Sequence, residues 1–273
     1  NGQLKPLDLG ALQAHIAKAA EGLEGIDVQA IIDETVKNLY NGVKESDIAT
    51  TMMMATRTRI EQEPNYTYVT ARLLRDNLVA TGMEFLGLPA DTLENDALET
   101  FLKKGIALEL LSAELLNFDL AKLAAAIQPE RSNQFTYLGL QTLFDRYFIH
   151  SDGVRFELPQ LFFMRVSMGL ALNEDDKEAR AIEFYNLLSS FDYMASTPTL
   201  FNSGTLRPQL SSCYLTTIGD DLYSIYGAMR DNAMLSKWAG GLGNDWTPVR
   251  ALNSYIKGTN GKSQGVVPFL KVA

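Results

Sequence analysis

Cysteine is nearly absent from this sequence, because Cys213 is the only one in 273 residues. A single cysteine cannot form an internal disulfide framework, so the composition favours a reducing, cytoplasmic setting. Histidine is almost as scarce: His15 and His150 lie far apart, and nothing around them has the spacing of a zinc site. We therefore expect that this chain binds no metal of its own.

Long apolar runs and an excess of basic residues are missing as well. No apolar stretch approaches the roughly 20 residues that span a bilayer, and no basic flank with a hydrophobic stretch marks a signal peptide. The 24 Lys and Arg are outnumbered by 33 Asp and Glu, which gives a net charge of −9. This balance excludes broad nucleic-acid binding and leaves room only for a small nucleotide at a local site. Because the first residue is Asn1, we expect that further sequence precedes it.

Apolar residues at helical spacing fill the first third of the chain. They predict four helices: one capped by Asp8, one opened by Asp27 and stopped at Asn41-Gly42, one from Ile48 to about Glu61, and one from about Thr67 to Gly82. Met52, Met53 and Met54 either fill the core of this bundle or form an adaptable binding surface, and core packing is favoured.

Residues 90 to 195 continue as helices after a linker at Gly87–Pro89. The clearest are Leu108–Leu116, Leu120–Ile127 and Leu161–Leu172, the last with Pro159 at its first position. Between them, Ser151-Asp152-Gly153 predicts a small β-hairpin flanked by Phe148 and Phe156. From Thr197 the composition shifts to Gly, Pro, Ser, Thr and Asn, and Leu210–Ile218 predicts a short buried strand.

Three stretches in this second half are similar to one known family. They are Thr136–Tyr147, followed by Glu157-Leu158-Pro159-Gln160 and Phe163-Met164-Arg165; Ser196–Gly204; and Gln209–Leu215, followed by Gly219–Leu222 and Ser224-Ile225. In this order and spacing they resemble the N-terminal part of the large subunit of class I ribonucleotide reductases. The resemblance covers essentially the whole chain.

The resemblance implies a mainly α fold. Residues 1–88 would form a four-helix, ATP-cone-like regulatory module and residues 89–195 a helical domain. Residues 196–273 would begin a ten-stranded α/β barrel that is truncated here.

The implied reaction is the reduction of a ribonucleoside diphosphate to its 2′-deoxy form by thiyl-radical chemistry. The family's partners would be a radical-generating small subunit with its own metal-radical cofactor, a second large subunit in a homodimer, and thioredoxin or glutaredoxin. ATP and deoxynucleoside triphosphate effectors would bind with Mg²⁺. No cofactor would bind directly to this chain, and neither nucleic acid nor a membrane would be a partner.

The implied substrate site contains Thr199, Ser212, Cys213 and Gly241. In the family the cysteine at this position belongs to a redox pair that reduces the ribose, and its two partner cysteines lie on later barrel strands. The residues alone allow a plainer interpretation, in which Cys213 is an inert core thiol and the hydroxyls belong to turn-forming loops. Because no second cysteine is present, we expect the fragment alone to be inactive.

The implied effector site contains Asp220, Asp221, Leu222, Arg250 and Lys257. Asp220 suits a ribose hydroxyl, and Arg250 and Lys257 suit a triphosphate. Taken alone, these are solvated surface charges. The run Ala239–Gly243 resembles the family's glycine-rich turn against which substrate packs, although it has no Walker spacing.

The N-terminal module lacks basic residues that the family pattern has. Ala11 and Ala80 stand where the family has lysines, and Glu45 stands where it has a threonine. Residues 1–88 carry eight Lys and Arg against twelve Asp and Glu. Such a field repels a nucleoside triphosphate, so we expect a degenerate module that binds ATP and dATP poorly.

Two alternatives remain open from the sequence. A cobalamin-dependent class II reductase can share the substrate barrel and needs no small subunit. The chain could also serve only as a regulatory or assembly module, because it lacks a complete active site.

Overall fold

The computed structural model describes residues 4–237 and 240–273, which divide into two compact units. The first unit runs to Met194 and includes Gly204–Leu206. The second comprises Ala195–Ser203 and Arg207–Ala273. Within the described part of the chain, no helix is both long and apolar enough to cross a membrane.

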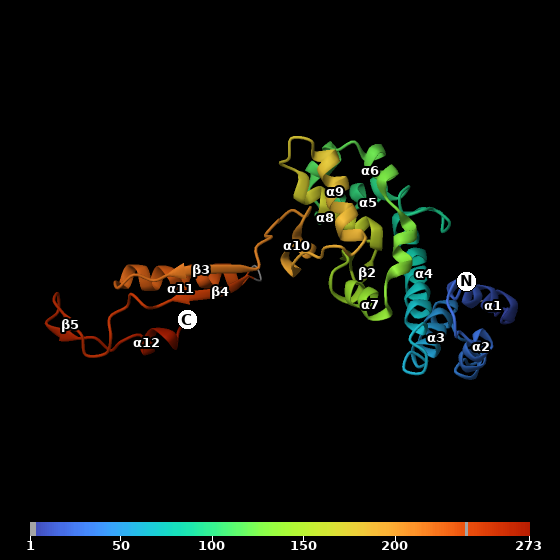
Figure 1. The fold of residues 1–273 in the computed structure, drawn as a ribbon, viewed down its shortest axis with the longest axis horizontal. Helices are drawn as coiled ribbons and strands as arrows, with labels where there is room; N and C mark the ends of the chain where they lie inside the picture. The colour runs from blue at the N-terminus through green and yellow to red at the C-terminus, as the bar shows by residue number, and fades with distance from the viewer. Residues whose placement is uncertain (1–3, 238–239) are drawn as a thin grey trace. The chain divides into compact units, whose positions relative to one another are not determined.

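Four helices open the first unit, as the sequence predicted (Figure 1): α1 (Leu9–Ala19), α2 (Val28–Lys37), α3 (Glu45–Arg57) and α4 (Tyr66–Leu86). The two predicted caps are confirmed, because Asp8 and Asp27 accept hydrogen bonds from the amides of Ala11 and Ala30 at 2.9 Å. Each cap satisfies an amide that the helix leaves unpaired. The apolar faces form one core of buried residues: Leu12, Ile16, Ala19, Ile31, Ile32, Met52, Tyr66, Val69 and Leu73.

Several details of this bundle differ from the prediction. Helix α2 ends at Lys37 rather than at Asn41-Gly42, and α3 spans Glu45–Arg57 rather than Ile48 to about Glu61. Helix α4 continues through Gly82 to Leu86, and Gly82 lies against Leu158, where a Cβ would be 2.9 Å from Leu158 Cδ2. The helix ends where Gly87 takes a left-handed φ of 72°. Core packing is confirmed for Met52, but Met54 is 47% exposed, so the three methionines do not share one environment.

Seven helical segments make up the rest of the first unit: α5 (Leu98–Ala107), η1 (Ala113–Asn117), α6 (Leu120–Ala126), η2 (Pro129–Gln134), α7 (Tyr137–Arg146), α8 (Pro159–Ala171) and α9 (Lys177–Ser189). Helix α8 begins at Pro159 as predicted and is buried along nearly its whole length. The prediction of a helix at Leu108–Leu116 is wrong. The chain leaves α5 at Ala107 and turns at Glu109, whose φ is 58°.

The predicted hairpin is confirmed by β1 (His150–Ser151) and β2 (Val154–Arg155), which pair antiparallel. Its two turn residues, Asp152 and Gly153, both have positive φ, as a two-residue hairpin turn requires.

Helix α4 packs against α1 and α3 and also against α7, η2 and β2. Residues on both sides of the boundary at 88/89 therefore belong to one compact unit. The division into a regulatory module and a helical domain stays a prediction.

The second unit contains α10 (Thr197–Asn202), β3 (Cys213–Thr217), α11 (Leu222–Lys237), β4 (Gly241–Asp245), β5 (Tyr255–Ile256), β6 (Gly261–Lys262) and α12 (Val267–Leu270). Strands β3 and β4 are parallel, and α11 connects them, so they form one β-α-β unit. Ile218, Ile225 and Ala228 form its small core.

The strand expected at Leu210–Ile218 exists as β3, but its predicted burial is wrong. Cys213 is exposed, and Leu215 is 87% exposed. Parallel strands are normally covered on both faces by helices. Here β3 pairs with β4 in a two-stranded sheet, and α11, which packs against β4, can cover one face of it but not both.

Candidate functional site

The predicted substrate residues meet where β3 and β4 begin. Cys213 pairs with Gly241 in the parallel register, and the Gly241 amide donates to the Ser212 carbonyl at 2.9 Å. Ser212, Cys213 and Gly241 are all exposed. The structure thus brings together three of the four expected residues, with the thiol accessible at the edge of the sheet.

The exposure of Cys213 bears on its role. The plainer interpretation from the sequence made it an inert thiol in an apolar core. A cysteine on the exposed start of a strand is instead open to a substrate or to another thiol.

The glycines at the start of β4 permit close contact between the two strands. A Cβ on Gly241 would lie 2.9 Å from the Ser212 carbonyl oxygen, and one on Gly243 would lie 2.8 Å from Leu215 Cδ2. The expectation of a glycine-rich turn is wrong for Gly241–Gly243, which are extended in β4, while Ala239 lies outside the described residues. None of these described glycines has a positive φ, so their small size explains their presence.

Thr199, the fourth expected residue, lies in α10. Its hydroxyl donates to the Leu210 carbonyl at 3.2 Å, and the Asn202 side chain donates to the Gln209 carbonyl at 2.8 Å. These bonds attach α10 to the segment that enters β3. The Thr199 hydroxyl must therefore release the Leu210 carbonyl, its present acceptor, before it can donate to a phosphate oxygen.

Asp220 and Arg250, both expected at the effector site, bind each other. Arg250 Nε lies 2.8 Å from Asp220 Oδ2, and the Arg250 amide donates to Asp220 Oδ1 at 3.0 Å. The hydrogen bond from the Arg250 backbone amide and the Arg250 guanidinium together lower the pKa of the Asp220 carboxyl from its usual value, against a smaller opposing effect of burial. Arg250 Nη1 also approaches the Tyr255 carbonyl at 3.4 Å. The two residues are thus partners rather than independent solvated charges.

The other expected effector residues lie on either side of this ion pair. Asp221 Oδ1 accepts from the Ser224 amide at 2.8 Å and so caps the first turn of α11. Leu222 is the exposed first residue of that helix, and Lys257 is exposed in the turn between β5 and β6. The structure therefore gives Asp221 a structural role, as a cap of α11, that the sequence analysis did not predict.

A cavity of about 990 Å³ is bordered by α1, α3 and the loop before α3. Ala11, where the family has a lysine, lies on its wall, together with Lys5, Asp8, His15 and Lys44. Ala80 borders a different cavity, and Glu45 is the first residue of α3. Within residues 4–237 and 240–273, no group of three or more His, Cys, Asp or Glu side chains is arranged to hold a metal.

Two buried acidic residues were not singled out as functional from the sequence. Glu157 and Arg165 are fully buried and paired at 2.7 Å, and Glu157 also accepts from the Ile149 amide. Glu94 is buried and accepts from the Gln160 amide at 2.8 Å, at the first turn of α8. The two carboxyls thereby bind backbone amides 8 and 66 residues away in sequence, outside any helical or turn spacing that the sequence could signal.

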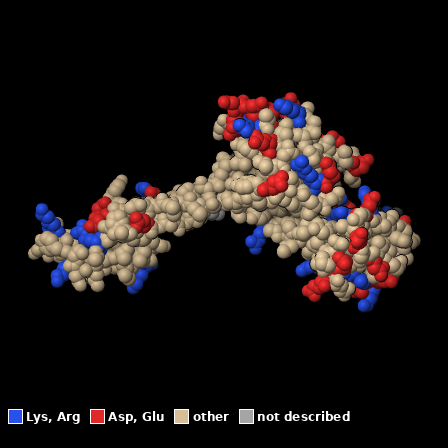
Figure 2. Space-filling view, viewed as in Figure 1, with Lys and Arg blue, Asp and Glu red and all other residues tan. Residues whose placement is uncertain are grey.

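Charged side chains are interspersed on the face of the molecule in Figure 2. Asp and Glu alternate with Lys and Arg over the helical unit, while the surface over β3 and β4 is largely uncharged. No continuous basic band crosses the described residues on this face, which agrees with the net charge of −9.

Two models of one protein family match this chain. The all-alpha domain of ribonucleotide reductase matches residues 133–208, and the barrel domain of ribonucleotide reductase matches residues 211–273. The second match begins two residues before Cys213, so β3, α11 and β4 fall at the start of the barrel domain.

Curated relatives extend the similarity to the N-terminal helices. The ribonucleoside-diphosphate reductase subunit alpha of Chlamydia trachomatis is 50% identical over 265 residues, which are 96% of this chain and 25% of the relative. The subunit alpha of Helicobacter pylori is 35% identical over 275 residues, which are 100% of this chain and 34% of the relative. The large subunit of Danio rerio is 35% identical over 96% of this chain and 33% of the relative.

The chain spans a quarter to about a third of the length of these relatives. The later part of its helical first unit, from residue 133, falls within the all-alpha domain, and its β-α-β unit falls at the start of the barrel. The chain belongs to the ribonucleotide reductase large-subunit family.

Proposed function

We propose that the complete subunit containing this chain reduces ribonucleoside diphosphates to 2′-deoxyribonucleoside diphosphates, and that Cys213 supplies one of the reducing thiols. The observation that carries the proposal is the position of Cys213 at the start of β3, directly beside Ser212 and Gly241, within the segment that matches the barrel domain.

The proposed reaction balances without a cofactor bound to this chain. A dithiol and a ribonucleoside diphosphate give a disulfide, a 2′-deoxyribonucleoside diphosphate and water. A thiyl radical on a cysteine outside this chain removes the C3′ hydrogen, which activates the neighbouring C2′–OH bond. Cys213 and a second cysteine outside this chain then provide the two electrons and protons. The fragment therefore catalyses no reduction alone.

The residues around Cys213 would hold the substrate. Ser212 and Thr199 carry hydroxyls that suit a diphosphate, and Gly241 leaves space beside the thiol because it has no side chain. Charge plays little part here, since β3 has no charged residue and the one charged residue of β4, Asp245, lies at the opposite end of the pair from Cys213 and Gly241. Binding would depend on hydroxyls and on backbone amides.

The pair of Asp220 and Arg250 would belong to the effector site, together with Asp221, Leu222 and Lys257. A deoxynucleoside triphosphate with Mg²⁺ would compete with Asp220 for the Arg250 guanidinium, which suits phosphate oxygens. In a homodimer of large subunits, this site would select the substrate.

Other partners follow from the reaction. The radical requires a small subunit with a metal-radical cofactor, and the disulfide requires thioredoxin or glutaredoxin as reductant. Both suit a reducing cytoplasm, where a single exposed cysteine stays a thiol.

An assay of the complete subunit tests this function. We expect it to convert CDP to dCDP with a dithiol reductant only when the small subunit is added. Conversion with adenosylcobalamin alone would assign the protein to the cobalamin-dependent class instead. Binding of effectors without any conversion, with either addition, would leave only the regulatory or assembly role.

A further inference from the structure

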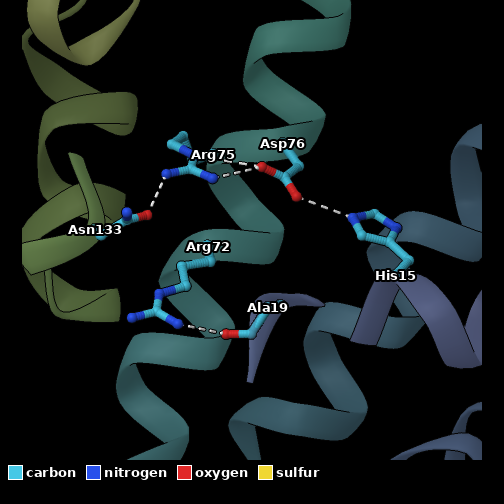
Figure 3. Close-up of polar contacts among 6 residues, drawn as sticks. All are labelled: His15, Ala19, Arg72, Arg75, Asp76 and Asn133. Atoms are coloured by element: carbon cyan, nitrogen blue, oxygen red, sulfur yellow. Dashed lines mark hydrogen bonds and ion pairs between the residues drawn. The ribbon is translucent and has the colours of Figure 1, made fainter. Parts of the chain in front are cut away.

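Four side chains from three segments of the first unit form a continuous polar chain (Figure 3). His15 on α1 contacts Asp76 on α4, with Nε2 and Oδ2 3.0 Å apart. Arg75 Nη2 donates to the other carboxylate oxygen, Asp76 Oδ1, at 3.0 Å. Arg75 Nη1 donates in turn to the Asn133 side-chain oxygen on η2, at 2.5 Å. These hydrogen bonds thus link His15 to Asn133 through two neighbouring residues of α4.

Asp76 is the centre of this arrangement. Its side chain is 29% exposed. Burial alone would raise its pKa, but the hydrogen bonds and charges of His15 and Arg75 outweigh burial and lower the pKa. The carboxyl is therefore ionised and accepts on both oxygens, so His15 Nε2 carries the hydrogen of the first contact. Each partner holds one oxygen, and the loss of either partner frees the carboxylate to rotate.

Arg75 depends on Asp76 for its position. Arg72 lies one turn earlier on α4 and donates to the Ala19 carbonyl at 2.9 Å, where α1 ends. It also donates to the Glu21 carbonyl at 2.8 Å. Burial and the nearby positive charge of Arg75 lower the pKa of Arg72. The carboxylate of Asp76 compensates this repulsion between the two guanidinium groups. Movement of Asp76 would therefore change where Arg75 points.

The two ends of this hydrogen-bonded series of side chains border different cavities. His15 lies on the wall of the 990 Å³ cavity beside α1 and α3. Arg75, Asp76 and Asn133 border a second cavity of about 660 Å³, between α4 and η2. A change at the first cavity that moves His15 therefore has a direct polar route to η2.

We propose that His15, Asp76, Arg75 and Asn133 form a polar relay that couples the position of α1, at the wall of the first cavity, to the position of η2. The relay follows from the contacts alone and does not depend on the proposed reductase activity. Loss of the His15 contact lets Asp76 turn fully toward Arg75, which draws the guanidinium away from Asn133. Segment η2 then loses a contact that fixes it on α4.

Hydrogen exchange of the full chain tests the relay. In His15→Ala, we expect the amides of residues 130–134 to exchange about threefold faster or more, as energetic coupling between connected residues implies. His15→Gln, which keeps a donor, should restore slower exchange there. Gln13→Ala, an exposed change on the same helix, should leave residues 130–134 at the native rate.

The reverse experiment keeps the proposal testable if His15→Ala does not fold. Coupling between two sites is reciprocal, so Asn133→Ala, which changes an exposed residue, should speed exchange around His15 in α1. Faster exchange confined to α1 in His15→Ala, or unchanged exchange of α1 in Asn133→Ala, would overturn the relay.

Discussion

At the scale of single residues, Glu94 shows how burial changes chemistry. The carboxyl is buried at the first turn of α8, where it accepts from the Gln160 amide. Burial raises its pKa from 4.5 to about 7, although the hydrogen bond from Gln160 acts in the opposite direction. The folded chain therefore binds a proton at Glu94 over a pH range in which the unfolded chain does not.

This shift predicts a pH-dependent stability. Because the pKa of Glu94 is higher in the folded chain than in the unfolded chain, its proton binding stabilises the folded state. This stabilisation is fully present below about pH 4.5 and is lost as the pH rises through about 7. Glu94→Gln removes the titration. Its free energy of unfolding relative to the native chain should therefore rise between pH 5 and 8 by about 2–3 kcal/mol at most, at about 1.4 kcal/mol per pKa unit.

Urea unfolding of both chains at pH 5, 6.5 and 8 measures this difference. Glu130→Gln changes an exposed carboxyl that borders the 660 Å³ cavity together with Glu94; it serves as the control and should show no such trend. Parallel pH profiles for the native chain and Glu94→Gln would contradict the assignment.

At the scale of elements, a glycine sets the packing of α5. A Cβ on Gly105 would lie 2.5 Å from Leu111 Cδ1 and 2.8 Å from Leu111 Cγ, and Leu111 is buried. Gly105→Ala should therefore lower the free energy of unfolding by about 1–3 kcal/mol through overpacking, despite alanine's higher helix propensity.

Thermal or urea unfolding checks this prediction against a second helical glycine. Gly227 on α11 has no atom within 4 Å of a built Cβ, so Gly227→Ala should be neutral or stabilise the second unit by up to about 1 kcal/mol. Equal effects of the two substitutions would show that helix propensity, and not contact with Leu111, decides the outcome.

Arg250, in the loop from β4 to β5, is expected to contribute to effector binding. If Arg250 contacts the triphosphate, Arg250→Ala should weaken deoxynucleotide binding to the complete dimer by about 1–3 kcal/mol, because a charge-assisted contact is lost. Calorimetry would measure the affinity. Arg180→Ala, at an exposed arginine of α9, should leave it unchanged. An equal affinity in Arg250→Ala would return Arg250 to a role confined to its pair with Asp220.

At the scale of the whole molecule, local sequence signals predicted where helices and turns begin better than they predicted which residues are buried or in contact. Asp8, Asp27 and Pro159 marked helix starts, and Asp152-Gly153 marked the hairpin, because caps and turns depend on neighbouring residues. The turn at Glu109 was missed, since a left-handed conformation of glutamate leaves no pattern in the sequence.

The candidate site was predicted only in part, for the same reason. Motif similarity located Cys213, Ser212 and Gly241, which the structure brings together. It did not reveal the bond between Asp220 and Arg250, 30 residues apart, or the contact between His15 and Asp76, 61 residues apart. Such pairs depend on how helices and strands pack, which composition and spacing do not encode.

The N-terminal helices are expected not to act as an ATP sensor. Ala11 leaves the wall of the 990 Å³ cavity without the family's lysine, and residues 1–88 carry a net charge of −4. Titration calorimetry of ATP and dATP into the 273-residue chain, with Mg²⁺, should show no binding at micromolar concentrations. Micromolar, Mg²⁺-dependent binding that Lys44→Ala weakens would establish a working nucleotide site there instead.

The central claim is that Cys213 is a reducing thiol of a ribonucleotide reductase, and turnover by the complete subunit carrying Cys213→Ser tests it most directly. Serine is nearly isosteric with cysteine, so the variant should fold and bind nucleotides normally. With the small subunit and a dithiol reductant present, we predict that multiple-turnover formation of dCDP from CDP is abolished. Deoxynucleotide production at nearly the native rate would contradict the account.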